Sequence, residues 1–475
     1  MNDNNTLKKA ITLSAIGKYS TVILQIVATG ILSRILTPNE YGTIAIILVF
    51  VIFFQLFADM GFGSAIIQDK NLTEDEINHI YSITFYLGLL LMVLFIVLTY
   101  PISLIYSDFI YINIGILLSF SLFFSALNIV PNAIILKKKM FVKVTLRTVI
   151  ISFISIMVAI ILAFNGFGVY ALVIQSIVSS IGIFVWNRLN VPLRIHLKPD
   201  FKVLKKIWVY SIFQFGSQAV NYLNRNLDNL LIGKFFTKSE LGQYNKAYTL
   251  MQFPISFLPG IITPILHPIL SEYQNDRDFI YTKYLSMLKV LSLLGIFGAA
   301  FSLFAGEEII LIVFGNQWYF SIAPFKFLSL SLWMQIMTNT VGAIYQSLGQ
   351  TRLMFFSTVI TTIIITSLII LGILLNSIDY VALLVSVGYI ISFFLTFYLL
   401  VNKGFDKNFN SFLGTFIKDF IIFTLLIILA IFWPLSINNI YISFLVKFSV
   451  MFIFYSFLLI VTRQYKILIV FLKRS

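Results

Sequence analysis

Residues 207–235 read IWVYSIFQFGSQAVNYLNRNLDNLLIGKF, an apolar stretch long enough to cross a lipid bilayer. Polar side chains recur in it every three or four residues, which places them on one face of an α-helix. An Arg or Asp at bilayer depth costs about 2.5–3.5 kcal/mol on insertion scales, so such groups face a wet cavity or a partner. The stretch therefore predicts a polar path inside a membrane. This polar stripe consists of Ser211, Gln214, Gln218, Asn221, Arg225 and Asp228.

The composition of the whole chain is that of an all-α polytopic membrane protein. Of its 475 residues, 59% are hydrophobic and 11% are charged, and the mean hydropathy is +0.96. These values exclude a soluble globular domain. The net charge of +14 does not indicate nucleic-acid binding, because the basic residues lie in short loops between apolar runs. The absence of cysteine excludes disulfides and thiolate metal sites, and it leaves the redox compartment open.

Apolar windows of about 20 residues, the length that spans a bilayer, occur fourteen times. With a cytoplasmic amino terminus, 24 of the 33 Lys and Arg residues lie in end segments and loops on the cytoplasmic side, and four lie on the other. This asymmetry predicts that both termini are cytoplasmic. No small-residue cleavage site follows the first run, so we expect an uncleaved span. The predicted spans lie near 11–35, 42–67, 80–105, 109–136, 144–164, 168–187, 207–235, 241–270, 284–304, 323–347, 353–375, 379–401, 413–433 and 440–462.

The chain matches itself at an offset of 200 residues. Residues 34–42 have the pattern R-x-x-T-x-x-E-x-G, and residues 234–242 repeat it with Lys in place of Arg. Chance similarity in an apolar chain is the alternative, but each copy follows the first span of a half and each first span carries polar positions. An even number of spans separates the copies, which indicates a parallel repeat. We expect an N-lobe at 1–190, a C-lobe at 191–402 and two additional helices at 403–475.

Four segments resemble a known family. They are SRILTPNEYG at 33–42, FADMGFGSAIIQ at 57–68, NYLNRNLDNLLIG at 221–233 and FGNQW at 314–318. The chain resembles the Wzx-type oligosaccharide flippases and polysaccharide exporters of the MOP (MATE-like) superfamily, in the branch related to colanic and teichuronic acid export. The resemblance implies two six-helix lobes in a V shape plus two further helices. It also implies transport of an undecaprenyl-diphosphate-linked oligosaccharide from the cytoplasmic to the outer leaflet of the bacterial cytoplasmic membrane.

Arg225 is the residue of the polar stripe best suited to a diphosphate, because its planar guanidinium matches phosphate oxygens. We expect Lys18, on the first span, to assist it. The neutral stripe residues Asn221, Gln218 and Gln214 would then hydrogen-bond sugar hydroxyls. The alternative is that Arg225 only neutralises the nearby Asp228, since buried charges are usually paired. Three further candidates complete the predicted substrate-binding set: Gln25, Asn224 and Arg34.

Asp228 is the first candidate for coupling transport to a proton or sodium gradient, because burial can raise the pKa of a carboxyl group toward neutrality. Asp59 is the second candidate, although capping of a broken helix end explains it more simply. Arg34 and Lys234 occupy equivalent places near the outer face. Each precedes a Thr-x-x-Glu that predicts a capping box, and guidance of phosphate at the exit is a secondary role for the basic residue.

The remaining basic residues have structural explanations. We expect a basic cluster near the cytoplasmic face to contact anionic lipid and set topology, and Lys289 and Lys447, near span ends, to snorkel. The three histidines, at 79, 196 and 267, show no metal-ligand spacing, so we expect neither a metal nor another cofactor. The basic cluster consists of Lys137, Lys138, Lys139, Lys143 and Arg147.

Enzyme signatures are absent, and no catalytic residue is predicted. The chain has no phosphate-binding G-x-x-x-x-G-K-[ST] motif, and the D-x-D at 276–278 lies in a loop too short for a glycosyltransferase domain. The competing functions are a membrane-embedded glycan polymerase, a MATE-like drug exporter and a lipid II flippase. Short, nearly uncharged outer loops disfavour the polymerase. Besides its lipid-linked substrate, the expected partners are membrane lipid and the glycan polymerase machinery.

Overall fold

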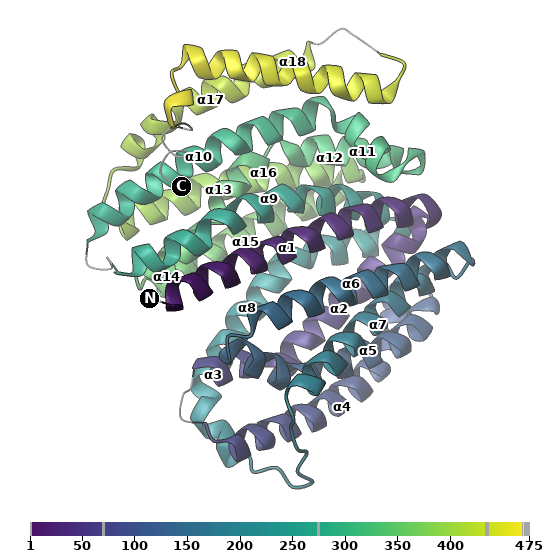
Figure 1. Ribbon diagram of the computed structural model, residues 1–475. Helices are drawn as coiled ribbons and strands as arrows, with labels where there is room; N and C mark the ends of the chain where they lie inside the picture. Colours follow the sequence, from purple (N-terminus) through teal and green to yellow (C-terminus); the bar gives the residue numbers. More distant parts are fainter. Residues whose placement is uncertain (1, 69–71, 273–275, 433–436, 468, 470–475) are drawn as a thin grey trace. The chain divides into compact units, whose positions relative to one another are not determined.

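The computed structural model describes residues 2–68, 72–272, 276–432, 437–467 and 469 (Figure 1). It describes the backbone alone at residues 2–16, 18, 204–214, 217, 220–221, 223–225, 258, 260–272 and 351. The described chain consists of helices joined by short connections and contains no strand. It divides into two compact units, Met1–Gly242 and Gln243–Ser475. The predicted all-α class is therefore confirmed.

The first unit contains eight complete helices among its described residues and the first turn of a ninth. In this conformation the last complete helix, α8, packs against α2, so the unit extends past the lobe boundary expected at residue 190. That lobe boundary stays a prediction. The helices are α1 (Asn2–Ile35), α2 (Pro38–Asp59), α3 (Phe62–Gln68), α4 (Glu74–Ile105), α5 (Ile110–Lys137), α6 (Phe141–Phe164), α7 (Val169–Asn190), α8 (Lys202–Phe235) and the start of α9 (Lys238–Glu272).

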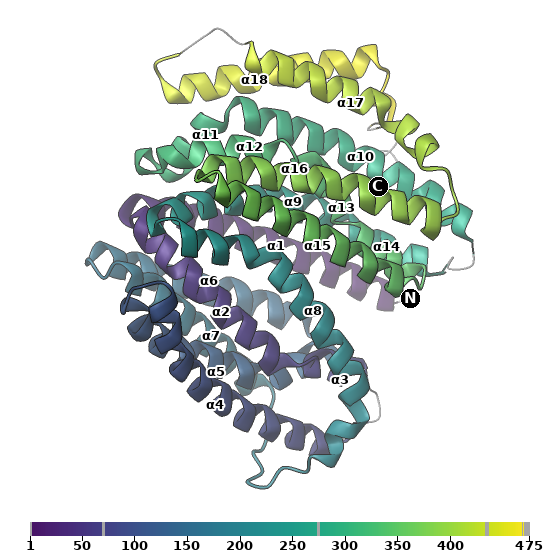
Figure 2. The ribbon, with the colours of Figure 1, turned by 180° about the vertical axis from the view of Figure 1, so that it is seen from behind.

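The second unit contains the rest of α9 and the carboxy-terminal helices. The two last long helices, α17 and α18, lie against α10 (Figures 1 and 2). The helices are α10 (Arg277–Phe304), α11 (Gly306–Phe314), η1 (Asn316–Ser321), α12 (Ile322–Ser329), α13 (Leu332–Thr338), α14 (Val341–Ser347), α15 (Thr351–Leu374), α16 (Ile378–Leu399), η2 (Leu400–Gly404), α17 (Phe409–Ile431) and α18 (Ile440–Val461).

Ten helices of the described residues are long and apolar enough to cross a membrane, or eleven if one bent pair counts as a span. The chain is thus a multi-pass membrane protein, but the predicted count of fourteen is not confirmed. The other three predicted spans, 11–35, 207–235 and 241–270, fall on α1, α8 and α9. Part of each of these helices is described by its backbone alone.

The span predicted at 323–347 falls on two helices that count as one candidate span only when they are taken together, because the helix is broken. Its two halves, 316–329 and 332–347, meet at 56°. Hydroxyl groups flank the break: Ser329 Oγ donates to the carbonyl oxygen of Phe325 at 2.8 Å, and Ser331 Oγ donates to that of Leu328 at 3.0 Å. Such bonds compete with the helical hydrogen-bond ladder and bend helices.

The prediction that Lys289 and Lys447 snorkel is wrong. Lys289 Nζ lies 3.1 Å from Oδ1 of Asp419, and Lys447 Nζ lies 2.5 Å from Oε1 of Glu308. Both acids are buried, with exposed fractions of 0% and 4%. A snorkelling lysine would leave each carboxylate unpaired in an apolar surrounding, which costs more than an extended side chain gains. These pairs join α10 to α17 and α11 to α18.

Arg147 departs from the expectation for the basic cluster, because it is 8% exposed instead of facing lipid headgroups. Its Nη1 donates to Oδ1 of Asn132 at 2.9 Å and to Oδ1 of Asn187 at 2.8 Å. Asn187 in turn donates to Asn128 at 2.7 Å. This network joins α5, α6 and α7, and the amide oxygens replace the water that the guanidinium would otherwise bind.

Candidate functional site

All six positions of the polar stripe lie on α8, as predicted from their spacing. Two of them have described side chains: Gln218 is half-buried and Asp228 is buried. Gln25 and Arg34 are exposed on α1. The remaining candidates lie outside the described side chains, so their roles and their contacts stay predictions. They are Ser211, Gln214, Asn221, Asn224 and Arg225 on α8 and Lys18 on α1.

Aromatic side chains hold α8 along α2. The ring of Tyr222 stacks on that of Phe53, with centroids 6.3 Å apart, and its hydroxyl donates to the carbonyl oxygen of Val49 at 2.8 Å. Seven residues earlier, Phe215 contacts Phe57 with centroids 4.8 Å apart. At about 100° per residue, the stripe positions centre roughly 80° around the helix from this aromatic face. Contact with α2 thus orients α8. The stripe positions lie to one side of the aromatic contact between the two helices.

The polar stripe ends at Asp228, which is buried together with its neighbour Asn229. Their exposed fractions are 5% and 6%, and the Asn229 N–H donates to Oδ1 of Asp228 at 2.8 Å. A carboxylate so far from water needs polar contacts to stay charged. Asp228 therefore does not face lipid, in agreement with its predicted inward orientation.

Asp59 ends α2 at a break in the chain. Met60 and Gly61 adopt positive φ values of 38° and 76°, and α3 then begins at Phe62. Oδ1 of Asp59 accepts from the Gly63 N–H at 3.4 Å. The carboxylate thus compensates unpaired N–H groups at the start of α3, which is the capping contact expected from the sequence. Its role in ion coupling is not tested.

The two copies of the repeat form matching capping boxes. The Thr37 N–H donates to Oε2 of Glu40 at 2.7 Å, and the Thr237 N–H donates to Oε2 of Glu240 at 2.9 Å. In each copy the glutamate N–H returns a hydrogen bond to the threonine hydroxyl. These local bonds start α2 and α9 at equivalent places.

The repeated glycines bring the two copies into direct contact, which the sequence did not reveal. A Cβ at Gly42 would lie 1.8 Å from the carbonyl oxygen of Lys238, and a Cβ at Gly242 would lie 2.0 Å from that of Pro38. The contact is reciprocal, so each copy supplies the glycine that the other copy's carbonyl covers. We call residues 38–42 and 238–242 the repeat contact. Only a residue without a side chain permits so close a backbone approach.

Basic residues of the second copy fasten it to the turn between α4 and α5. Lys238 pairs with Asp108, and Lys234 Nζ donates to the carbonyl oxygen of Ile105 at 2.6 Å. The Tyr106 hydroxyl also donates to the carbonyl oxygen of Leu230 at 3.2 Å. Lys234 is thus engaged with backbone in this conformation, although both Lys234 and its equivalent Arg34 are exposed.

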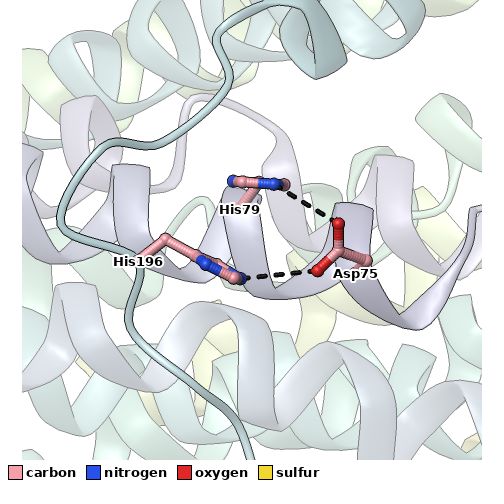
Figure 3. A group of neighbouring side chains, drawn as sticks. All are labelled: Asp75, His79 and His196. Atoms are coloured by element: carbon pink, nitrogen blue, oxygen red, sulfur yellow. Dashed lines mark ion pairs between the residues drawn. The ribbon is translucent and has the colours of Figure 1, made fainter.

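A cluster of two histidines and one aspartate was not predicted from the sequence, because its members come from distant segments. His79 on α4 and His196 in the α7–α8 linker, residues 191–201, stack with ring centroids 4.3 Å apart (Figure 3). Asp75, one turn before His79, faces both rings. The spacing of Asp75 and His79 was visible in the sequence, but nothing in the sequence places His196 beside them.

Comparisons with known proteins give the relationships of the chain. A family profile described as Polysaccharide biosynthesis protein matches residues 31–323. The chain is 26% identical over 358 residues to an uncharacterized membrane protein in the cps region of Klebsiella pneumoniae, covering 73% of this chain and 72% of that protein. It is also 26% identical over 353 residues to the teichuronic acid biosynthesis protein TuaB of Bacillus subtilis, covering 72% and 71%. Identity to the succinoglycan biosynthesis transport protein ExoT of Rhizobium meliloti is 21% over 381 residues, covering 77% and 74%.

Solved structures share the fold. A structure of the lipid II flippase MurJ in an inward closed conformation superposes with a TM-score of 0.76 at 16% identity, covering 96% of this chain and 99% of that one. An inward-facing multidrug MATE transporter of the MOP superfamily superposes with a TM-score of 0.66 at 15% identity, covering 80% and 93%. Together with the family match, these findings confirm the predicted resemblance.

Proposed function

Because the chain belongs to the family of polysaccharide biosynthesis proteins, we propose that it moves a lipid-linked oligosaccharide from the cytoplasmic to the outer leaflet of a bacterial cytoplasmic membrane. The family match, found on a multi-pass helical protein, carries the proposal. TuaB and ExoT support a glycan cargo. ExoT is a transport protein, which favours a transporter over a glycan polymerase. The lipid is an undecaprenyl diphosphate, both termini are cytoplasmic, and the polymerase machinery receives the product.

The repeat contact supports alternating access as the mechanism. Two equivalent helix starts meet through backbone packing at Gly42 and Gly242, without interlocked side chains at those positions. Such a contact separates and re-forms as a unit once the Lys238–Asp108 pair and the bond from Lys234 to Ile105 break, because the two glycines themselves have no side chains to rearrange. In our proposal it closes the outer side of the path while the cargo enters from the cytoplasm, and it opens for release.

A deletion strain tests the proposed cargo. Loss of the protein should leave the lipid-linked repeat unit on the cytoplasmic leaflet and remove one surface glycan. Both effects should be reversed by the intact gene. Accumulation of lipid II together with cell lysis would instead assign the chain to peptidoglycan precursor transport, and normal glycan export would contradict the proposal.

Arg225→Ala should lower the transport rate roughly 10- to 100-fold. The reason is that a charge-assisted hydrogen bond from a guanidinium to a phosphate oxygen contributes about 1.5–3 kcal/mol. The transport rate of Arg225→Lys should lie between those of the parent and Arg225→Ala, because lysine keeps the charge and loses the bidentate geometry. Transport is measured as glycan export in the deletion strain at equal protein levels. Arg352→Ala is the matched control, since that side chain is exposed and lies over the ring of Phe356.

A double variant separates substrate binding from simple charge pairing. If Arg225 and Asp228 only neutralise each other, Arg225→Gln combined with Asp228→Asn restores downhill exchange in sealed vesicles, which needs no gradient coupling, because neither charge is left alone. If Arg225 binds diphosphate, the double variant stays as slow as Arg225→Gln. Recovery to the normal rate would therefore remove Arg225 from the substrate site.

Asp228→Asn should abolish the response of transport to an imposed proton gradient while leaving downhill exchange intact. The substitution keeps the shape of the buried side chain and removes its titration. The measurement is exchange of lipid-linked oligosaccharide in sealed vesicles with and without the gradient. Asp406→Asn is the control, because Asp406 lies on an exposed ion pair with Arg277. An unchanged response in Asp228→Asn would assign coupling to another group or to a sodium gradient.

A further inference from the structure

The cluster of Asp75, His79 and His196 offers three ligand atoms to one point. Nε2 of His79 lies 3.4 Å from Oδ2 of Asp75, and Nε2 of His196 lies 3.5 Å from Oδ1 of the same carboxylate. One ligand atom from each residue lies within 4.8 Å of both others. In Figure 3 the two rings face different oxygens of the carboxylate from the same side. The three residues thus converge although they come from two segments.

The α7–α8 linker, residues 191–201, is held in place by the polar face of α4. The backbone N–H of Arg194 donates to Oδ1 of Asn78 at 2.9 Å, and that of His196 donates to Oγ of Ser82 at 2.8 Å. The Asp200 N–H donates to Nδ1 of His79 at 3.1 Å. Because these bonds fix its backbone, the side chain of His196 is presented to α4 in a defined position.

His196 carries an unsatisfied group directed at the cluster. Its Nε2 is enclosed and makes no hydrogen bond among the described residues. An enclosed ring nitrogen without a hydrogen bond is costly, and a cation between it and Oδ1 of Asp75, 3.5 Å away, would satisfy it. Four ligands at about 2.0–2.1 Å around a tetrahedral ion lie roughly 3.3–3.4 Å apart. Each ring nitrogen lies at about that edge length from one carboxylate oxygen of Asp75, 3.4 Å for His79 and Oδ2 and 3.5 Å for His196 and Oδ1.

We propose that Asp75, His79 and His196 bind a divalent transition-metal cation of the zinc type, with water as the fourth ligand. Two imidazoles and one carboxylate form a borderline-soft set that favours Zn²⁺ over Mg²⁺ or Ca²⁺. Three protein ligands leave one position open, as in exchangeable sites. Asp75 and His196 keep 73% and 33% of their side chains exposed, so the ion reaches them from solvent.

Metal binding changes one hydrogen bond of the linker. Nδ1 of His79 accepts the Asp200 N–H, so in the neutral ring the proton resides on Nε2. An ion on Nε2 moves that proton to Nδ1, which then donates and no longer accepts the Asp200 N–H. The ion therefore ties the linker to α4 at His196 and releases it at Asp200, next to the start of α8. Binding of the cation would thus change how the α7–α8 linker, which leads into α8, is held against α4.

Titration of the purified full-length chain with Zn²⁺ tests the proposal. One Zn²⁺ per chain should bind, Mg²⁺ should not compete, and Co²⁺ should give the intense visible absorption of a tetrahedral complex. His196→Ala and Asp75→Asn should each weaken binding roughly tenfold or more. His267→Ala is the matched control, since it removes the remaining histidine of the chain and should bind Zn²⁺ like the parent.

Hydrogen exchange provides a readout independent of affinity. Zn²⁺ should slow exchange of the His196 amide and speed exchange of the Asp200 amide, and neither change should occur in His196→Ala. Asp75→Asn covers the case in which His196→Ala disturbs the linker, because Asp75 is an exposed side chain. Absence of saturable Zn²⁺ binding, or equal binding by His196→Ala and the parent, would overturn the proposal. Neither outcome bears on glycan transport, which is tested separately.

Discussion

Asp419→Ala is expected to lower the free energy of unfolding by about 3–5 kcal/mol, because it removes the buried carboxylate that pairs with Lys289. Asp419 is 0% exposed, and its carboxylate accepts from Lys289, Ser292 and Gln464. Lys289 also lies over the ring of Phe416, 4.6 Å from its centroid. Removal of the carboxylate therefore takes this acceptor from Ser292 and Gln464, and it leaves Lys289 with the carbonyl oxygen of Thr415.

A double-mutant cycle identifies the cause. Asp419→Leu combined with Lys289→Met should recover much of the lost stability, since both charges are replaced by apolar groups. Arg277→Ala is the control, because its pair with Asp406 is exposed and contributes about 0–1 kcal/mol. The measurement is reversible unfolding of the purified protein in mixed detergent. If Asp419→Ala is no less stable than Arg277→Ala, the pair does not hold α17 to α10.

Gly42→Ala and Gly242→Ala should each destabilise the repeat contact by about 1–3 kcal/mol and reduce transport. The added methyl group would overlap a backbone carbonyl oxygen in both cases, and a backbone cannot move aside as a flexible side chain can. The two helix starts must therefore separate. Because the glycines face each other's segment, the double variant should cost less than the sum of the single variants: one separation relieves both overlaps.

Gly414→Ala is the matched control for the glycine variants. It places the same methyl group on α17 where nothing lies within 4 Å, so it should leave stability unchanged or raise it by about 0.5–1 kcal/mol. Stability is measured as above, and transport is measured as glycan export in the deletion strain. Gly42→Ala that matches Gly414→Ala in both measurements would contradict the reciprocal packing and its proposed role as the outer closure.

Local features of the fold were predictable from the sequence. Apolar runs and the spacing of polar positions predicted the helices and the position of the stripe on α8. The Thr-x-x-Glu patterns predicted both capping boxes, since the bonding partners are only three residues apart. The break in the span at 323–347 was not predictable, because hydropathy reports apolarity and not the serine contacts that bend a helix.

The partners of buried polar groups were not predictable in this way. Lys289, Lys447 and Arg147 each lie near the end of an apolar run, where a lysine or arginine usually reaches toward water. Their actual partners lie on other helices, up to 139 residues away in the sequence. Which carboxylate or amide meets each of them depends on how the helices pack.

The sequence by itself determined that the chain is an all-helical, multi-pass membrane protein with a duplicated loop and a polar helix, because hydropathy, helical spacing and capping act over a few residues. Only the tertiary structure decided that Gly42 and Gly242 cover each other's neighbours, that Asp419 holds Lys289, and that His196 meets Asp75 and His79. These contacts join distant segments. Their formation depends on close packing between helices, and no local pattern specifies it.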